Sequence, residues 1–258
     1  MNKFSLGVFL DVFTNDKIEL QSKIDFIKSI PNLGHIEILL EVDIPPETIN
    51  WLNEQLSGYQ IIVHGPFMCL GFISVHDQIN QTSLDIYKKS IDKSINLQAK
   101  LITIHAGKHP FYLDSQQVIE LFSKNFNELV NYANNQIILT IENMPRKSDA
   151  QVHFPLLDGL DNIAQIITNI NYTIDIGHCL ENGEDYYKFI QENKNRIKNI
   201  HLHNAIKNGK SHFGLQLPGG LDTKKFVNFL NEIDYQGFLT LEVLTNEDKV
   251  KSIKLIQN

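Results

Sequence analysis

Short apolar runs alternate along this chain with longer stretches of helical periodicity. Eight runs of five to seven residues are rich in β-branched and aromatic side chains, which favour strands. Between them, apolar residues recur every three or four positions, and this spacing predicts amphipathic helices over residues 84–97, 116–132 and 224–233. The predicted strands cover residues 4–10, 35–41, 59–65, 100–106, 136–142, 172–177, 199–203 and 237–243.

Strands that alternate with helices form βαβ units and a parallel sheet. Eight such units in 258 residues match the size of a (β/α)8 barrel. The alternative is an open, doubly wound sheet, which usually carries a glycine-rich phosphate loop after its first strand. The residues that follow Leu10 read DVFTNDK and contain no glycine. We therefore predict an α/β fold, a (β/α)8 TIM barrel that forms a single domain over residues 1–258.

The composition indicates which kinds of molecule we do not expect this protein to bind. Hydrophobic residues make up 42% of the chain and charged residues 21%, so we expect an ordered core. The formal net charge of −7 provides no basic field, so we expect neither a nucleic-acid nor a membrane partner. We find no signal-peptide pattern and no run of the roughly 18 apolar residues that a membrane span needs. Cys69 and Cys179 are expected to be free thiols, and the sequence predicts a cytoplasmic protein.

Histidines and carboxylates recur at the ends of six predicted strands, each 26 to 41 residues from the next. A lone histidine in an apolar strand is usually a hydrogen-bonded core residue, but one such residue per unit is a pattern. The carboxyl ends of barrel strands converge on one mouth, and a buried carboxylate there needs a partner or a metal ion. The sequence therefore predicts a metal site with nitrogen and oxygen ligands. The candidate ligands are His64, His105, Glu142, Asp175, His201 and Glu242.

Two residues near this set have open roles. His203 shares its strand parity with His201, so the pattern alone does not decide which of the two is a ligand. Glu37 interrupts the apolar run HIEILLE, and it either points into the mouth or forms a structural pair.

The strand-end motifs VHGPF, IHAG, IENMP, DIGH, IHLHN, LPGG and GFLTLEV occur in the same order as in a known family. Together they resemble the xylose isomerase-like TIM-barrel superfamily. That group includes sugar and sugar-phosphate isomerases and epimerases, and also endonuclease IV-type apurinic endonucleases. The resemblance extends over nearly the whole chain, from the first strand to the last.

The resemblance implies a role for each matching residue. In the epimerases, carboxylates and one histidine from the last four strands hold a divalent ion, and the matching residues are Glu142, Asp175, His201 and Glu242. The two glutamates would also be the acid/base pair, and His178 matches a substrate contact. In the endonucleases, His64 and His105 join Glu142 at a second metal position. We therefore expect one or two ions of Zn, Mn, Co or Mg.

The chain departs from the endonuclease pattern at the third metal position. That position needs His178 together with an Asp-x-His pair, and here Lys210 stands where the aspartate is expected, before His212. A fixed positive charge there weakens the binding of a cation. The same loop contains Lys207 and His212, which are candidate substrate-binding residues together with His178 of the DIGH motif, and it could reach a substrate phosphate or carboxylate.

These features predict a divalent-metal-dependent isomerase or epimerase. Its substrate would be a small sugar or sugar phosphate, and its glutamates would transfer protons through an enediolate. The alternative is an endonuclease IV-like apurinic/apyrimidinic endonuclease or another metal-dependent phosphodiesterase. A third reading is a barrel that binds a ligand without catalysis. The substrate, the metal and the oligomeric state stay open at this point.

Overall fold

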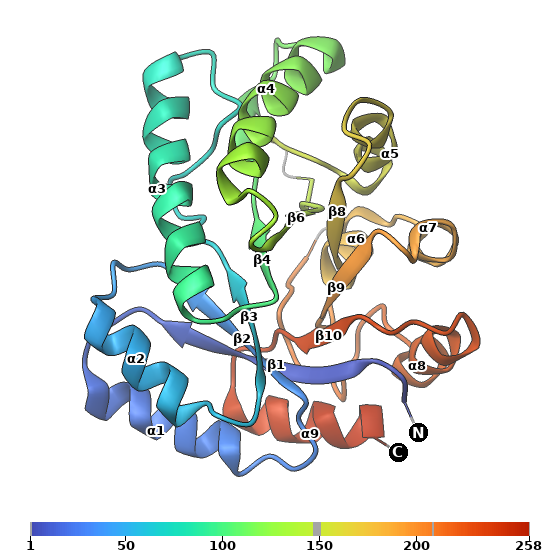
Figure 1. The fold of residues 1–258 in the computed structure, drawn as a ribbon. Coiled ribbons are helices and arrows are strands. Elements are labelled where there is room, and N and C mark those ends of the chain that lie inside the picture. The colour runs from blue at the N-terminus through green and yellow to red at the C-terminus, as the bar shows by residue number, and fades with distance from the viewer. Residues whose placement is uncertain (1, 147–150, 208, 258) are drawn as a thin grey trace.

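The protein is described by a computed structural model that covers residues 2–146, 151–207 and 209–257. Eight parallel strands close into a barrel in the order β1-β10-β9-β8-β6-β4-β3-β2 (Figure 1). This confirms the predicted α/β barrel, and every predicted strand is present with shifted ends. The barrel strands are β1 (Ser5–Val12), β2 (His35–Leu40), β3 (Gln60–His64), β4 (Leu101–Ile104), β6 (Ile138–Glu142), β8 (Asn171–Asp175), β9 (Ile197–Leu202) and β10 (Phe238–Leu241).

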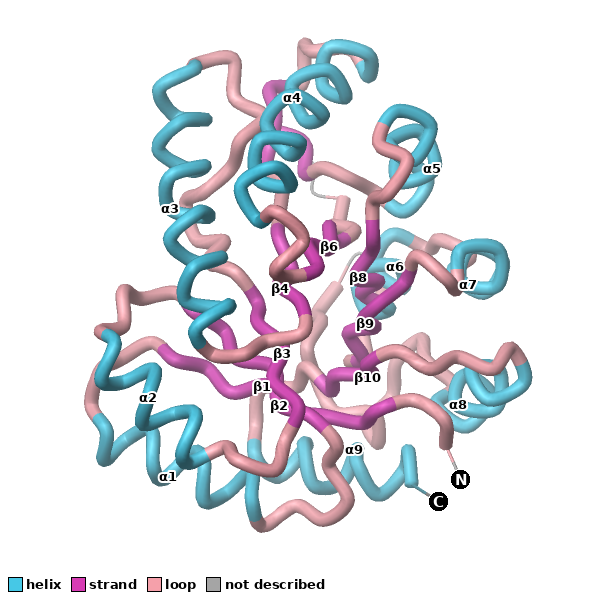
Figure 2. The backbone as a smooth tube through the Cα atoms, viewed as in Figure 1, coloured by secondary structure: helices cyan, strands magenta, loops and turns pink. Residues whose placement is uncertain are grey.

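Helices surround the barrel and bury their apolar faces against it (Figure 2). The three stretches predicted to be helical are helices. The first of them, α3, begins at Asp77, seven residues before the predicted start. α4 begins with a capping box between Asp114 and Gln117, which satisfies free backbone N–H groups of its first turn. The helices are α1 (Lys17–Lys28), α2 (Pro46–Gln55), α3 (Asp77–Asn96), α4 (Ser115–Ala133), α5 (Leu157–Ile166), α6 (Ile176–Asn182), α7 (Tyr186–Asn193), α8 (Thr223–Glu232) and α9 (Asn246–Gln257).

A small sheet outside the barrel was not predicted. β5 (Lys108–Pro110) pairs with β7 (Gln151–His153) in an antiparallel arrangement. Strands of three residues are too short to give an alternating apolar pattern, so the sequence carried no signal for them. Cys69 and Cys179 are free, as expected. Within the described residues, no helix is both long and apolar enough to cross a membrane.

The interior of the barrel contains a chain of polar side chains that leads to its mouth. Thr240 donates its hydroxyl to the Asn199 Oδ1 atom, so it accepts from His35 Nε2 at 2.9 Å. The His35 Nδ1 atom then accepts from the hydroxyl of Ser5 at 3.1 Å. Asn199 in turn donates to Glu37. Every donor in this chain is therefore directed toward one buried carboxylate.

Burial lowers the pKa of His35 to about 3, so its ring is neutral and serves as a structural relay. The ring lies directly against Gly7 of β1. A Cβ atom added at Gly7 would come within 2.4 Å of the His35 Cε1 and Nε2 atoms. Since the ring is held at both nitrogens, it has little freedom to move aside.

We therefore expect the substitution Gly7→Ala to destabilise the protein by about 1–3 kcal/mol, the usual cost of an overpacked core. The matched control is Gly159→Ala in α5, where the nearest atom to an added Cβ is 3.6 Å away. That change is expected to be neutral or stabilising by up to about 1 kcal/mol, because alanine favours a helix. Urea denaturation of both variants checks this, and equal effects would contradict the proposed clash.

Candidate functional site

The structure brings the six predicted ligands together at the mouth of the barrel. Each one lies within the last two residues of a strand or directly after it, and parallel strands point their carboxyl ends to the same side. Glu142 lies at the centre of the cluster. Its Oε2 atom is 3.0 Å from His105 Nε2 and 3.4 Å from both His64 Nε2 and His201 Nδ1. The remaining ligands, Asp175 and Glu242, approach His201 Nδ1 at 4.0 and 3.2 Å.

Two groups of donors that share Glu142 have the spacing of a metal site. His64, His105 and Glu142 form the first, and Glu142, Asp175 and His201 form the second. Within each group, one ligand atom per residue lies within 4.8 Å of the others. Both groups are buried and combine imidazole with carboxylate, a donor set that suits several divalent ions. Two further groups of this spacing both include His203, one with His178 and His212 and one with Asp175 and Glu242.

A buried atom without a hydrogen bond tests whether the second group fits a metal ion. Among the described residues, His201 Nδ1 and Glu242 Oε2 are both buried and have no hydrogen-bond partner. These two atoms lie 3.2 Å apart. Leaving such groups unsatisfied is costly, and a divalent cation between them would satisfy both. The donor set therefore fits a metal ion.

Glu37, the glutamate within the apolar strand β2, forms a buried pair with His201. Both of its oxygens lie 3.0 to 3.1 Å from His201 Nε2, so it points into the barrel and forms a pair there. The pair holds a proton on Nε2 and turns Nδ1 toward the carboxylates. A histidine that ligates a metal is commonly oriented by such a carboxylate.

His201 and His203 therefore differ in a way that their strand parity does not reveal. His203 uses Nε2 to contact Asp175 at 3.1 Å, while its Nδ1 accepts the backbone N–H of His212 at 3.0 Å. His201 keeps one ring nitrogen without a hydrogen bond. This difference favours His201 as the ligand.

The carboxylates and His201 at the mouth shift one another's pKa values toward the ionised forms. Burial opposes a charged ring at His201, but the carboxylates of Glu37, Glu142 and Glu242 outweigh it and raise the pKa of His201 well above its usual value. Burial would raise the pKa of Glu37, yet His201 lowers it to about 2. The same balance holds the pKa of Glu142 well below its usual range. The cluster is therefore ionised at neutral pH and strongly favours positive charge at its centre.

Asn143, which directly follows Glu142, fixes the next part of the site. Its side chain accepts the Asp175 backbone N–H at 2.7 Å and donates to the Asp175 carbonyl at 3.1 Å. Its own carbonyl accepts from His178 Nδ1 at 2.9 Å, which leaves the His178 Nε2 atom as an acceptor. The Asp175 carboxylate also accepts the His178 backbone N–H and so caps α6. The role of Asn143 was not predicted.

The loop after β9 carries two of the three candidate substrate residues, His212 and Lys207. His212 has a positive φ of 58°, and its Nδ1 atom lies 3.8 Å from the Glu242 Oε1 atom. A left-handed backbone at a residue with a side chain is strained and is often found at functional sites. Lys207 lies against Gly183 at the end of α6, where an added Cβ would come within 2.8 Å of its amine. Lys210 is exposed.

Asn204, near the start of this loop, holds its backbone in place. Its Oδ1 atom accepts the backbone N–H groups of Ala205 and Leu221, and its amide donates to the Leu217 carbonyl. A Cβ atom at Gly219 would come within 2.1 Å of Asn204 Oδ1. The LPGG motif therefore makes room for this asparagine and shapes the turn before α8.

An aromatic ring covers one side of the site. The Phe67 ring centroid lies 5.4 Å from that of His64 and 5.0 Å from that of His105. Phe67 is held in place because its backbone N–H donates to the Glu41 carboxylate at 2.7 Å. It therefore forms one wall of the site.

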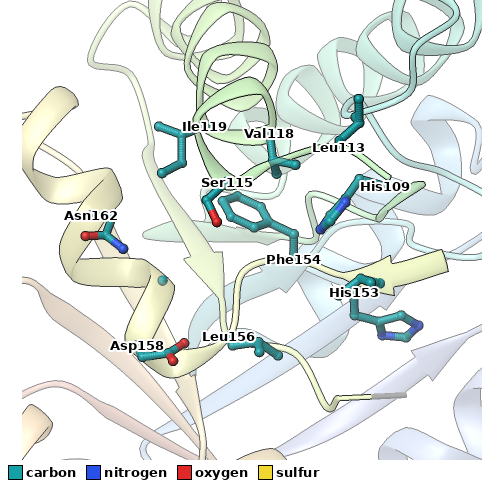
Figure 3. Close-up of a pocket in the computed structure, with 12 residues that line it drawn as sticks. His109, Leu113, Ser115, Val118, Ile119, His153, Phe154, Leu156, Asp158 and Asn162 are labelled. Carbon is teal, nitrogen blue, oxygen red and sulfur yellow. The ribbon is translucent and has the colours of Figure 1, made fainter. Parts of the chain in front are cut away.

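A separate cavity of about 420 Å³ lies outside the mouth, beside α4, α5 and the β5–β7 sheet. Figure 3 shows Phe154 reaching toward α4 within it, with Asp158 and Asn162 contributed by α5. None of the predicted site residues is among those that line it. The cavity is therefore distinct from the candidate metal centre.

The chain belongs to the xylose isomerase-like TIM-barrel family, whose sequence profile matches residues 35–257. An uncharacterized protein of Methanocaldococcus jannaschii is 28% identical over 222 residues, which cover 82% of this chain and 74% of that protein. A protein of Haemophilus influenzae, provisionally named as an L-ribulose-5-phosphate 3-epimerase, is 24% identical and covers 100% of this chain and 94% of its own length.

Solved structures share the fold. The crystal structure of a D-tagatose 3-epimerase-like protein superimposes with a TM-score of 0.83 at 21% identity, covering 98% of this chain and 96% of that one. The D-allulose 3-epimerase of a Methylomonas species in complex with D-allulose gives a TM-score of 0.75 at 16% identity, covering 99% and 90%.

The Glu37–His201 pair makes stability depend on acid. Because the pKa of Glu37 falls from 4.5 to about 2 on folding, the pair stabilises the folded state above about pH 4.5 and loses this contribution as the pH falls toward 2. The shift corresponds to ~3 kcal/mol. We expect Glu37→Gln to be less stable than the wild type at pH 7 and the gap to narrow below pH 4.5.

Urea denaturation in EDTA between pH 3.5 and pH 7 measures this gap. The control Glu54→Gln changes an exposed glutamate of α2 and is expected to show no gap at any pH. A gap for Glu37→Gln that stays constant over this range would refute the electrostatic explanation.

Proposed function

We propose that this protein is a divalent-metal-dependent isomerase or epimerase of a small sugar or sugar phosphate. The observation that carries the proposal is the pair of buried, unsatisfied atoms His201 Nδ1 and Glu242 Oε2. They lie beside two more buried carboxylates, Glu142 and Asp175. Membership of the xylose isomerase-like family supports it, as do relatives and structural neighbours whose names are those of sugar 3-epimerases.

The residues that would hold the ion are Glu142, Asp175, His201 and Glu242. His64 and His105, together with Glu142, could hold a second ion. When bound, a divalent ion of the Zn, Mn, Co or Mg type would act as a Lewis acid toward substrate oxygens.

Proton transfer next to a sugar carbonyl needs a base, an acid and stabilisation of the enediolate. Glu142 and Glu242 are assigned the first two roles. Glu142 ends β6 and Glu242 follows β10. These strands are separated in the barrel by β8 and β9, so the two glutamates approach the mouth from different strands. One carboxylate would remove the C–H proton and the other would return a proton to the opposite face of the same carbon.

The substrate contacts in this proposal are His178, His212 and Lys207. His178 presents Nε2 because its Nδ1 is bound to the Asn143 carbonyl. His212 lies at the edge of the mouth and is partly exposed. Lys207 is exposed beside the end of α6, and the proposal assigns it to a substrate phosphate or carboxylate.

We expect Glu142→Gln and Glu242→Gln to lower kcat for ketose epimerisation or isomerisation by about 100-fold or more, the usual contribution of a positioned acid or base. The measurement is incorporation of solvent deuterium into a panel of ketoses and ketose phosphates, followed by NMR. The exposed Glu54→Gln variant serves as the control and should keep full activity. Full activity in both active-site variants would remove the proposed roles.

Metal binding is expected to stabilise the folded protein by mass action. At a free metal concentration of 100 Kd, one ion raises the free energy of unfolding by about 2.7 kcal/mol. We expect Mn²⁺ added to the EDTA-treated protein to raise its Tm, and Asp175→Asn to abolish most of that rise. Elemental analysis of the purified protein gives the ion and its stoichiometry. A Tm that does not respond to Mn²⁺, Zn²⁺, Co²⁺ or Mg²⁺ would contradict a metal site.

A phosphodiesterase is the second candidate, and the intact group of His64, His105 and Glu142 favours it. Two features oppose it: the positive charge of the exposed Lys210 disfavours a third cation, and the net charge of −7 disfavours a DNA backbone. Incubation with an abasic oligonucleotide and Zn²⁺ separates the two. Metal-dependent nicking without deuterium incorporation would replace the isomerase with the endonuclease.

A further inference from the structure

His203 joins two parts of the site that come from different segments. Its Nε2 atom contacts the Asp175 carboxylate at the end of β8 at 3.1 Å. Its Nδ1 atom accepts the backbone N–H of His212, nine residues further along the chain, at 3.0 Å. The ring also stacks on the His212 ring, with the centroids 3.9 Å apart and the planes at 25°. A single fully buried side chain therefore contacts both a candidate metal ligand and the loop that carries a candidate substrate residue.

The chain makes room for this ring. A Cβ atom added at Gly177, in the first turn of α6, would come within 1.7 Å of the His203 Cε1 atom. Position 177 therefore excludes any side chain while His203 is in place. Gly177 of the DIGH motif and His203, the second histidine of IHLHN, therefore pack directly against each other.

Both ring nitrogens of His203 are engaged inside the protein. The His212 amide directs its hydrogen at Nδ1 at 3.0 Å, so this nitrogen accepts and the ring proton lies on Nε2, facing Asp175. The Asn204 carbonyl lies farther from Nδ1, at 3.3 Å. The ring is therefore held between the Asp175 carboxylate and the loop that follows β9.

We propose that His203 is a positioning residue with two separable roles. Its Nε2–H orients the Asp175 carboxylate toward the metal centre, and its Nδ1 holds His212 in the left-handed conformation that places the His212 ring beside Glu242. The first role rests on the proposed metal-dependent function, whereas the second concerns the chain alone. The position of the substrate-facing loop and the geometry of a metal ligand then depend on different atoms of one imidazole.

Two substitutions separate the roles, because side-chain amides can mimic one ring nitrogen each. In His203→Asn, the Oδ1 atom can take the place of Nδ1 and accept the His212 N–H, but nothing reaches Asp175. In His203→Gln, the Nε2 amide can take the place of the ring Nε2–H and donate to Asp175, but the acceptor for the His212 N–H is lost. The control is His76→Gln, which changes an exposed histidine.

Two measurements follow each variant, and neither needs catalytic activity. Isothermal titration of the EDTA-stripped and dialysed protein with Mn²⁺ gives the metal affinity. We expect His203→Asn to weaken Mn²⁺ binding by about 10- to 100-fold, as is usual for partners of metal ligands, and His203→Gln to retain most of the affinity. Hydrogen–deuterium exchange of the His212 amide in EDTA, read by NMR, gives the state of the loop. We expect exchange to accelerate by about tenfold in His203→Gln, the worth of one hydrogen bond, and to stay slow in His203→Asn.

The opposite pattern, or equal loss of Mn²⁺ binding in both variants, would overturn the proposal, because a histidine that ligates the metal directly would be replaced by neither amide. Unchanged exchange of the His212 amide in His203→Gln would overturn the loop role. If the wild type binds no Mn²⁺, the proposed function fails, while the exchange measurement still decides whether His203 holds His212. Thermal unfolding of each variant identifies any loss of folding before the two readouts are compared.

Discussion

The mouth of this barrel is organised by buried negative charge. Glu37, Glu142 and Asp175 are almost fully buried, and Glu242 lies beside them with one oxygen that no hydrogen bond satisfies. Isolated carboxylates in such a place would take up protons. Here their pKa values are instead lowered by the histidines around them. The cluster thus stays ionised only because imidazoles, or a metal ion that competes with their protons, supply positive charge.

The scaffold below the mouth keeps this charge in one arrangement. The chain of hydrogen bonds from Ser5 through His35, Thr240 and Asn199 to Glu37 has a single direction. A parallel layer of buried hydroxyls joins Thr103, Thr140 and Thr173 at 2.8 to 3.3 Å. Polar groups inside a barrel are tolerated when every one has a partner. Because the partners come from different strands, the position of His201 depends on the closure of the whole barrel, and the fold and the site stabilise each other.

The sequence predicted the barrel because its signal is repeated: eight apolar runs, one per unit, each coincide with a strand. It predicted for the same reason that the six candidate ligands lie close together, since strand ends converge in any such barrel. It did not predict the role of Asn143 and left the role of Glu37 open between two alternatives, because a single asparagine or glutamate has no periodicity of its own. The β5–β7 pair was also missed, since its strands have three residues each. Contacts that depend on side chains meeting across strands are invisible to a pattern along one strand.

His201 and His203 show most clearly what a sequence pattern cannot distinguish. They lie two residues apart, His201 within β9 and His203 directly after it, and sequence spacing treats them alike. The residues around them in the structure, however, differ. Glu37 occupies Nε2 of His201 and leaves Nδ1 facing the carboxylates, whereas Asp175 and the His212 amide occupy both nitrogens of His203. The role of each ring therefore depends on which of its nitrogens already contacts another group in the barrel. His201 keeps a nitrogen free to bind a metal and is a candidate ligand, whereas His203 supports the candidate ligand Asp175.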